Sequence, residues 1–335
     1  MTRVERASHR GVEGLAIEDD HLQCVILPSI GGKMTSLRLK ESGREFMWQD
    51  PEGPVKLPSY GAFLPDYDIG GFQECFPTIN EVFYPDHPWR GVVVPDHGEV
   101  WALPWNYERV EDGLHLWVHS VRFAYRLNKW VTMRAGGRLD LRYELTSLAP
   151  FNFRCLWSAH PALALRPGMM MMLPEGTRVR TEFSEHGRLG EMGQLHDWPV
   201  TRTAKGQQVD LSAVQGIEAG THDKLNTVGL AEGWCAASDP QTGEYLAYTF
   251  SLKEIPYVGV WLIQGGWAPE GQPYLVGGFE PCTGYPGPLD SAMAWGACMT
   301  LPGRGKLGWS LEIHVGCESD QATLISILSE AAAAK

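Results

Sequence analysis

The sequence predicts an all-β protein with one large antiparallel β domain and a short C-terminal helix. Short apolar runs alternate with period two, as in residues 34–39 and 139–145, which is typical of half-buried strands. The 38 glycines and 23 prolines are scattered along the chain, and this suits many short strands joined by turns. Helical character is confined to residues 320–335, where leucines and isoleucines precede a run of alanine.

Taken in order, the chain begins with a polar leader at residues 1–20 and then shows strand patterns separated by two long, weakly periodic stretches, 50–105 and 175–215. The strand patterns lie at residues 22–28, 34–39, 44–48, 114–118, 123–127, 130–133, 137–147, 153–158, 169–173, 246–250, 258–263, 292–301 and 307–315. The four-methionine run in 169–173 indicates a thioether-lined core strand rather than a soft-metal site. No composition break or repeat is visible, so we expect one domain over residues 1–335.

Composition argues against several classes of partner. The net charge is −12 and no basic run exceeds two residues, which makes a nucleic acid or an anionic membrane an unlikely partner. The seven cysteines are odd in number and widely spaced, so neither a disulfide framework nor a zinc knuckle is indicated. The start of the chain has no apolar signal region, and no 18-residue apolar span occurs. We therefore expect a reduced, cytoplasmic protein, either monomer or homodimer, with no metal.

The segment 277–286, Gly-Gly-Phe-Glu-Pro-Cys-Thr-Gly-Tyr-Pro, is the one around which the chain is organised. A β-type run leads into two glycines that allow close backbone approach, and Pro281 follows Glu280 where ladder pairing would end. A carboxylate that loses water at the mouth of an apolar strand is suited to act as a general base. The alternative is that Glu280 is a solvated residue at the edge of a loop.

Three histidines have distinctive surroundings. His160 lies at a strand end before a proline, His97 is flanked by Asp96 and a glycine, and His222 is expected in a polar loop. A single histidine is more often structural than catalytic. The sequence contains no nucleophile elbow, no dinucleotide or phosphate loop and no His-Glu-x-x-His metal motif. The sequence therefore offers no motif for these kinds of nucleophilic, nucleotide-dependent or metal-dependent chemistry.

Five motifs in order resemble the aldose 1-epimerase (galactose mutarotase-like) superfamily, closest in style to the branch of hexose-6-phosphate epimerases. The resemblance spans about residues 24–315 and rests on the opening strands at 25–48, Gly-Gly-Phe-Gln-Glu-Cys-Phe-Pro at 70–77, His-Gly at 97–98, His-Pro at 160–161 and Phe-Glu-Pro at 279–281. It implies a large antiparallel β-sandwich, the galactose mutarotase-like supersandwich. It also implies an isomerase that interconverts the α and β anomers of a sugar.

Carried over to this chain, the resemblance makes Glu280 the general base on the C1 hydroxyl and His160 the general acid on the ring oxygen. His97 would bind and polarise the sugar near that oxygen. Ring opening removes a proton from one oxygen and delivers one to another, so an acid and a base must act on the same sugar. The reaction needs no metal or redox cofactor. We expect His97, His160 and Glu280 to lie close together although they are distant in the chain.

The residues that would recognise the sugar depart from the family pattern. The arginine before the Gly-Gly pair is here Ile69, and the residues after His-Gly and His-Pro also differ, which favours a neutral sugar over a hexose 6-phosphate. Asp223, with Lys224 beside it, could match a family aspartate that binds sugar hydroxyls or could be solvated. The further candidates for sugar binding are Glu74, Glu99 and Trp101. A solvated acidic rim over residues 66–99 is the alternative for the acids.

Two other functions stay open. A non-catalytic carbohydrate-binding or sensing protein could use the same scaffold, because fold does not fix function. A carbohydrate lyase or hydrolase is the third possibility, and hydrolysis would need two carboxylates facing the scissile bond. In the hydrolase case Glu74 or Glu99 would have to approach Glu280 in space.

Overall fold

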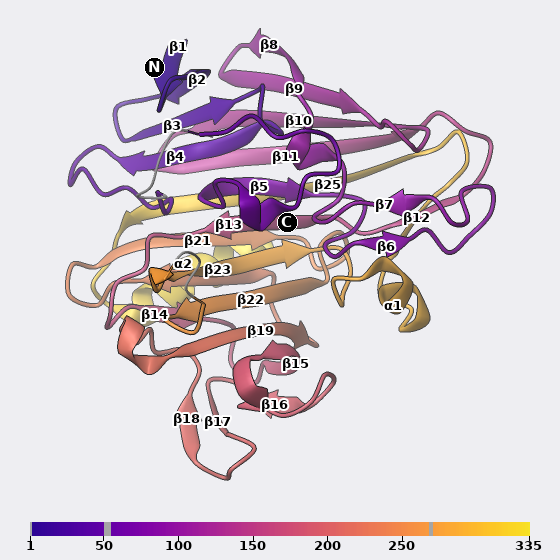
Figure 1. Cartoon of the computed structure of the whole chain (residues 1–335). Helices are drawn as coiled ribbons and strands as arrows, with labels where there is room; N and C mark the ends of the chain where they lie inside the picture. Colours follow the sequence, from indigo (N-terminus) through magenta and orange to yellow (C-terminus); the bar gives the residue numbers. More distant parts are fainter. Residues whose placement is uncertain (1, 50–54, 268–270) are drawn as a thin grey trace. The chain divides into compact units, whose positions relative to one another are not determined.

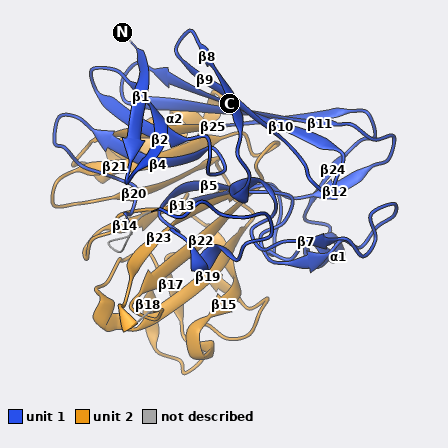
Figure 2. Ribbon diagram, turned by 45° about the horizontal axis from the view of Figure 1, so that its top comes forward, with its two compact units in different colours: residues 1–160, 282–311 blue, residues 161–281, 312–335 orange. Residues whose placement is uncertain are grey.

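The computed structural model describes residues 2–49, 55–267 and 271–335, and the chain divides into two compact units. Unit 1 contains residues 1–160 and 282–311, and unit 2 contains residues 161–281 and 312–335 (Figure 2). Three strands pass along the chain from one unit into the other: β13 (Ser158–Ala162), β23 (Leu275–Cys282) and β25 (Lys306–Cys317).

Unit 1 is built from antiparallel strands (Figure 1). One run of paired neighbours is β1-β2-β3-β4-β5 and another is β11-β10-β9-β8. The elements are β1 (Arg3–His9), β2 (Val12–Glu18), β3 (Leu22–Leu27), β4 (Lys33–Leu39), η1 (Leu64–Asp66), β5 (Gly71–Cys75), β6 (Val82–Phe83), β7 (Val93–Val94), η2 (Val100–Ala102), β8 (Asn106–Val110), β9 (Gly113–His119), β10 (Tyr125–Arg134), β11 (Arg138–Ser147), β12 (Phe153–Cys155), α1 (Leu289–Ala294) and β24 (Met299–Leu301).

Alternating burial explains why these segments form strands. In β11, Leu139, Leu141, Tyr143 and Leu145 are all buried while their neighbours are more exposed. The β10–β11 hairpin pairs from Tyr125↔Ser147 to Arg134↔Arg138. Period-two alternation puts one apolar row on one face of the pair, and burying that row stabilises the hairpin.

Unit 2 is also antiparallel and contains the longer C-terminal helix. Its paired runs are β23-β22-β19-β15-β16 and β14-β20-β21. The elements are β14 (Met170–Met172), β15 (Arg178–Ser184), η3 (Glu185–Gly187), β16 (Leu195–Asp197), β17 (Val200–Arg202), β18 (Gln208–Asp210), η4 (Ile217–Ala219), β19 (Thr221–Val228), β20 (Trp234–Ser238), β21 (Glu244–Phe250), β22 (Tyr257–Gln264) and α2 (Gln321–Ala333).

Helix α2 begins at a defined cap and buries one side. The Asp320 carboxylate accepts a hydrogen bond from the Thr323 N–H at 3.1 Å, which satisfies one of the free donors of the first turn. Leu324 and Leu328 are almost fully buried and belong to a core cluster with Trp234. The helix expected at the C-terminus is therefore confirmed, together with the all-β antiparallel class.

Three expectations about local structure were wrong. The polar leader is not a leader, because β1 and β2 pair from Arg3↔Glu18 to His9↔Val12 and β2 continues onto β3. The stretch expected as a strand at 292–301 contains the end of α1 before β24. The irregular stretch 175–215 contains β15 to β18. Strand β1 and the three-residue strands β16, β17 and β18 bury almost none of their side chains, so they carry little periodic signal in the sequence.

Among the described residues, no helix combines the length and the apolar character needed to cross a membrane.

Candidate functional site

Unit 1 brings His97 and His160 together. Their ring centroids lie 5.0 Å apart with the planes at 88°, an edge-to-face contact. His160 lies in β13 and is 6% exposed, whereas the side chain of His97 is 16% exposed. The expected proximity of these two histidines is confirmed, although they are far apart in the sequence. Both imidazole rings are largely shielded from solvent, and their mutual contact helps to fix the orientation of each ring.

Asp96 fixes the orientation of the His97 ring. Its Oδ2 lies 2.7 Å from His97 Nδ1 and also accepts the Leu64 N–H at 3.1 Å. A carboxylate at Nδ1 favours the proton on that nitrogen and leaves Nε2 as the acceptor of a neutral ring. From the sequence, Asp96 was expected only as one of the acids that bind a sugar or form a solvated rim, and this role was missed. The sequence signal for this contact was that Asp96 directly precedes His97.

Gly98 explains how the loop brings His97 to this place. Its φ is +77°, and a Cβ added there would lie 2.0 Å from the Phe76 carbonyl oxygen. The Glu99 N–H donates to the same carbonyl at 2.8 Å, and Phe76 and Gly98 form a parallel bridge. Residue 98 must therefore be glycine for the two motif segments, 70–77 and 97–98, to lie side by side.

Glu74 has a different setting from the one expected. It is fully buried in β5, its Oε1 lies 2.6 Å from Lys129 Nζ, and Lys129 is fully buried as well. Tyr143 donates to Oε1 at 3.0 Å and the Trp157 indole donates to Oε2 at 2.7 Å. A carboxylate engaged on both oxygens by protein donors is a core ion pair of unit 1. It is not part of a solvated rim.

Glu99 is engaged in the same way. It is fully buried and accepts from Tyr60 at 2.9 Å, Ser120 at 2.6 Å and Tyr125 at 2.8 Å, together with the Arg122 N–H at 3.0 Å. Burial and the Glu99 carboxylate raise the pKa of Tyr125, so its hydroxyl keeps the proton that it donates. Glu99 thus ties three segments of unit 1 together.

Trp101 is also inside unit 1. It lies in η2, is 2% exposed and donates its indole N–H to the Asp96 carbonyl at 3.0 Å. Its ring packs edge-on against Tyr67 at 5.9 Å. A tryptophan with these contacts supports the backbone that carries Asp96 and His97. Its expected role in stacking on a sugar stays a prediction.

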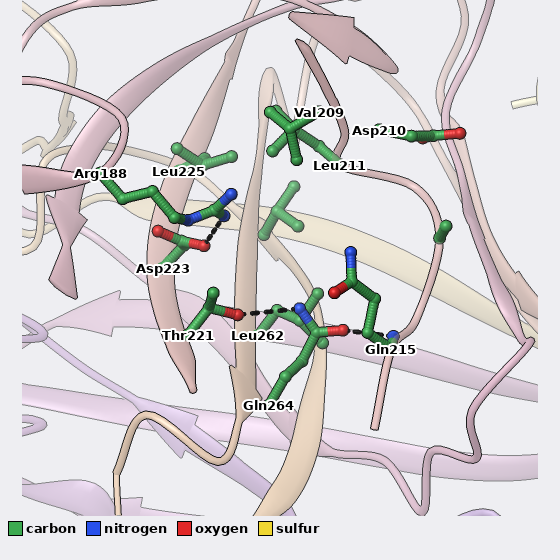
Figure 3. A pocket seen from close by; sticks show the side chains of 12 residues that line it. Arg188, Val209, Asp210, Leu211, Gln215, Thr221, Asp223, Leu225, Leu262 and Gln264 are labelled. Atoms are coloured by element: carbon green, nitrogen blue, oxygen red, sulfur yellow. Dashed lines mark hydrogen bonds and ion pairs between the residues drawn. The ribbon is translucent and has the colours of Figure 1, made fainter. Parts of the chain in front are cut away.

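In unit 2, Asp223 and Lys224 are neighbours in strand β19, so their side chains point to opposite faces of the sheet. Asp223 accepts the Ser184 hydroxyl at 2.6 Å and forms an ion pair with Arg188. Figure 3 shows Asp223 directed at Arg188. Both residues line a small cavity of about 50 Å³, together with Leu225, Leu262 and Gln264. Asp223 is 5% exposed.

Lys224, on the other face, forms an ion pair with Glu280. Glu280 lies in β23 and is 1% exposed, and the Lys224 side chain is 13% exposed. The alternative of a solvated loop glutamate is therefore wrong. Lys224 contacts Glu280, whereas Asp223 pairs with Arg188. The sequence predicted a role for Asp223 but none for Lys224.

Glycines make room around this ion pair. A Cβ at Gly259 would lie 3.2 Å from Glu280 Oε2 and 3.2 Å from Lys224 Nζ. Added Cβ atoms at Gly277 and Gly278 would each lie 2.4 Å from a backbone oxygen, of Trp261 and Pro161 respectively. The glycine pair before Glu280 thus permits close approach of neighbouring strands, as the sequence predicts.

Aromatic side chains flank the ion pair on the same face. Trp261 lies opposite Lys224 in the β19–β22 register, and its indole donates to His222 Nε2 at 3.2 Å. The Phe183 ring lies 5.0 Å from the His222 ring. Burial lowers the pKa of His222, and Glu185 and Asp223 oppose that effect. An Nε2 that accepts a hydrogen bond belongs to a neutral ring, in agreement with this direction. His222 lies within β19 and not in the expected polar loop.

The described residues contain no group of three or more His, Cys, Asp and Glu side chains able to hold a metal ion.

No protein-family model and no curated protein sequence matches the chain. Solved structures do. The Slr1438 protein of Synechocystis sp. PCC 6803 is similar with a TM-score of 0.67 at 17% identity, over 93% of this chain and 99% of that one. A Klebsiella pneumoniae protein provisionally described as an aldose 1-epimerase has a TM-score of 0.69 at 13% identity, over 99% and 87%.

A galactose mutarotase related enzyme from Lactobacillus acidophilus has a TM-score of 0.64 at 13% identity, over 92% of this chain and 98% of that one. The chain has the galactose mutarotase-like fold. The predicted resemblance is therefore confirmed at the level of fold. Identities this low carry no residue roles from those galactose mutarotase-like proteins to this chain.

Proposed function

We propose that the protein is an aldose 1-epimerase that interconverts the α and β anomers of a sugar by acid–base ring opening. The observation that carries the proposal is the contact of His97 with the buried His160, with Asp96 on His97. Two imidazoles in contact, one of them oriented by a carboxylate, suit proton delivery to a ring oxygen. The fold shared with galactose mutarotase-like proteins supports the same reaction class.

In the proposed reaction Glu280 removes the proton from the C1 hydroxyl. The O–H electrons form the C1 carbonyl, the C1–O5 bond breaks, and O5 takes a proton from His160. Rotation about C1–C2 and the reverse steps give the other anomer. His97 holds the sugar near O5. Atoms and charge balance without any redox partner, and each proton transfer contributes about 10²–10⁴-fold to the rate.

A second function is favoured by one specific observation. The Glu280 carboxylate is already engaged by the Lys224 ammonium in an ion pair. A sugar-binding protein without catalysis would tolerate that arrangement. A hydrolase is less well supported, since the protein donors that surround Glu74 and Glu99 leave neither placed as a second catalytic carboxylate.

The test is saturation-transfer NMR of anomeric protons across a panel of aldoses, with wild type, Glu280→Gln and His160→Asn. We expect the wild type to accelerate exchange for at least one sugar and each variant to lower that rate by about 10²-fold or more. Specific binding without accelerated exchange would favour the sugar-binding protein. Exchange that survives in Glu280→Gln would contradict the assigned base.

A further inference from the structure

Unit 2 contains a larger cavity, of about 530 Å³, beside the small one shown in Figure 3. Its walls are residues 185–188, the turn and second strand of the β17–β18 hairpin, Gln215, and residues 219–221. The two cavities share four lining residues, Arg188, Val209, Gln215 and Thr221. A volume of this size lies in the range of roughly 300–1,000 Å³ that is typical of small-ligand sites.

The larger cavity is separate from the ion pair of Lys224 and Glu280. The small cavity is lined by Thr221, Asp223 and Leu225, which are alternate residues of β19, so all three lie on one face of the sheet. Lys224 lies on the opposite face, where it contacts Glu280. Because the larger cavity adjoins the small one and also has Thr221 in its wall, a ligand bound there would lie on the face away from Glu280.

Arg188 is the charged side chain that lines both cavities. Its guanidinium forms an ion pair with Asp223, whose other carboxylate oxygen accepts the Ser184 hydroxyl at 2.6 Å. The Arg188 Nε–H is buried and has no hydrogen-bond partner among the described residues. A buried donor without a partner carries a desolvation penalty. An acceptor atom of a ligand in either cavity would remove that penalty, and the Asp223 carboxylate already holds the guanidinium in place.

The lining of the larger cavity is rich in groups that both donate and accept hydrogen bonds. These are three glutamines, two threonines and a histidine: Gln207, Gln208, Gln215, Thr203, Thr221 and His186. Each primary amide offers two donors and an acceptor oxygen, and each hydroxyl offers one donor and two lone pairs. The three glutamines are exposed, so a solute can reach their amides. Such a lining matches a ligand whose own groups donate and accept, as hydroxyls do.

The charged and aromatic residues narrow the class of ligand further. The charged side chains of the lining, Glu185, Arg188 and Lys205, have both signs, and Asp223 pairs with Arg188 from the small cavity. Charge alone therefore selects neither an anion nor a cation. Among the described residues, no Phe, Tyr or Trp side chain lines the larger cavity, so a planar aromatic ligand would find no ring to stack on. A neutral polyhydroxy compound fits these features best.

Hydrogen bonds hold the walls of the larger cavity in place before any ligand binds. The Ala204 N–H, in the turn of the β17–β18 hairpin, donates to the Arg188 carbonyl at 2.9 Å and ties the hairpin to residues 185–188. Gln264 donates to the Thr221 hydroxyl at 3.0 Å and accepts the Gln215 N–H at 2.5 Å. Walls that are fixed in advance lower the entropic cost of binding.

We propose that the larger cavity is a second, non-catalytic binding site for a neutral saccharide unit, a role that goes beyond the proposed reaction and does not depend on it. The Arg188 Nε–H donates to a sugar hydroxyl, and the amides of Gln207 and Gln208 donate to and accept from its neighbours. Asp223 was expected from the sequence to bind sugar hydroxyls itself. In this site it is a positioning residue, which acts through the guanidinium that it holds.

The experiment titrates ¹⁵N-glycine-labelled protein with D-glucose, D-galactose, maltose, cellobiose and inorganic phosphate, and follows the amide signals by NMR. Gly187 and Gly220 line the larger cavity, whereas Gly259 lies beside the Lys224–Glu280 ion pair and reports on that face separately. We expect at least one saccharide to shift the Gly187 and Gly220 signals to saturation, with the same affinity in wild type and in Glu280→Gln.

Variants of the cavity wall complete the test. Ala204→Trp fills the cavity and keeps the backbone N–H, and it should weaken the saccharide by about tenfold or more. Gln208→Ala should weaken it several-fold through the lost amide, and Gln321→Ala, an exposed site on α2, should match wild type. If Ala204→Trp does not fold, Gln208→Ala decides, and an unchanged affinity in that variant contradicts the site.

Two results would overturn the proposal outright. One is that no saccharide shifts Gly187 and Gly220 to saturation, even where anomeric exchange is accelerated, and in that case the epimerase proposal would stand without this site. The other is that phosphate shifts these two signals and the saccharides do not, which would make the cavity an anion site. Saccharide shifts at Gly187 and Gly220 in a protein that exchanges no anomers would support the site while the epimerase proposal fails.

Discussion

The molecule contains two lysine–glutamate pairs that look alike in the sequence and differ in their surroundings. Glu74 and Glu280 each follow a Gly-Gly-Phe segment and each meets a lysine. Glu74 and Lys129 are fully enclosed, with Tyr143 and Trp157 as further donors. Lys224 keeps 13% exposure beside aromatic side chains. The same two residue types thus make a core support in unit 1 and a candidate reaction centre in unit 2.

The largest effect on stability should come from breaking the enclosed pair. Glu74→Gln leaves the Lys129 ammonium buried without its carboxylate, and we expect the free energy of unfolding to fall by about 3–5 kcal/mol. Glu280→Gln is the matched control, because the partly exposed Lys224 can remain hydrated, and it should cost less than about 2 kcal/mol. Urea denaturation followed by tryptophan fluorescence measures both. Equal losses in the two variants would remove the distinction between the pairs.

The next largest loss of stability should come from disturbing the close contact between the His97 loop and the Phe76 backbone. Gly98→Ala places a Cβ 2.0 Å from the Phe76 carbonyl oxygen at φ +77°, so we expect a loss of about 2–3 kcal/mol. Gly91→Ala is the matched control, since Gly91 has φ +83° and no atom within 4 Å of an added Cβ. It should lose only the conformational part, about 1 kcal/mol. If both variants lose the same amount, the close contact does not hold the loop.

The smallest effect concerns His222, and it depends on pH. Its pKa is lowered by burial from the ordinary value of 6.5, so the unfolded chain takes up a proton at a pH where the folded chain does not. The stability that neutral His222 contributes is therefore present above pH 6.5 and is lost as the pH falls toward the folded-state pKa. We expect the stability difference between wild type and His222→Gln to shrink between pH 8 and pH 5. A difference that grows on acidification would contradict a neutral ring bonded to Trp261.

Much of the fold could be predicted from the sequence, because apolar alternation in segments such as 139–145 encodes half-buried strands directly. The His97–His160 contact was anticipated through the family resemblance. The roles of the acids could not be separated, since Glu74 and Glu280 have nearly the same local sequence. Their difference comes from partners such as Lys129 that are distant in the chain. The ion pair of Lys224 with Glu280 could not be predicted from the sequence, because a register offset of one residue exchanges the two faces of a strand.

The most direct test of the account is anomeric exchange by Glu280→Gln, measured on protein whose near-UV circular dichroism and unfolding midpoint show an intact fold. The account predicts a folded variant in which exchange of the preferred sugar falls by about 10²-fold or more. A folded Glu280→Gln protein that exchanges anomers as fast as wild type would contradict it.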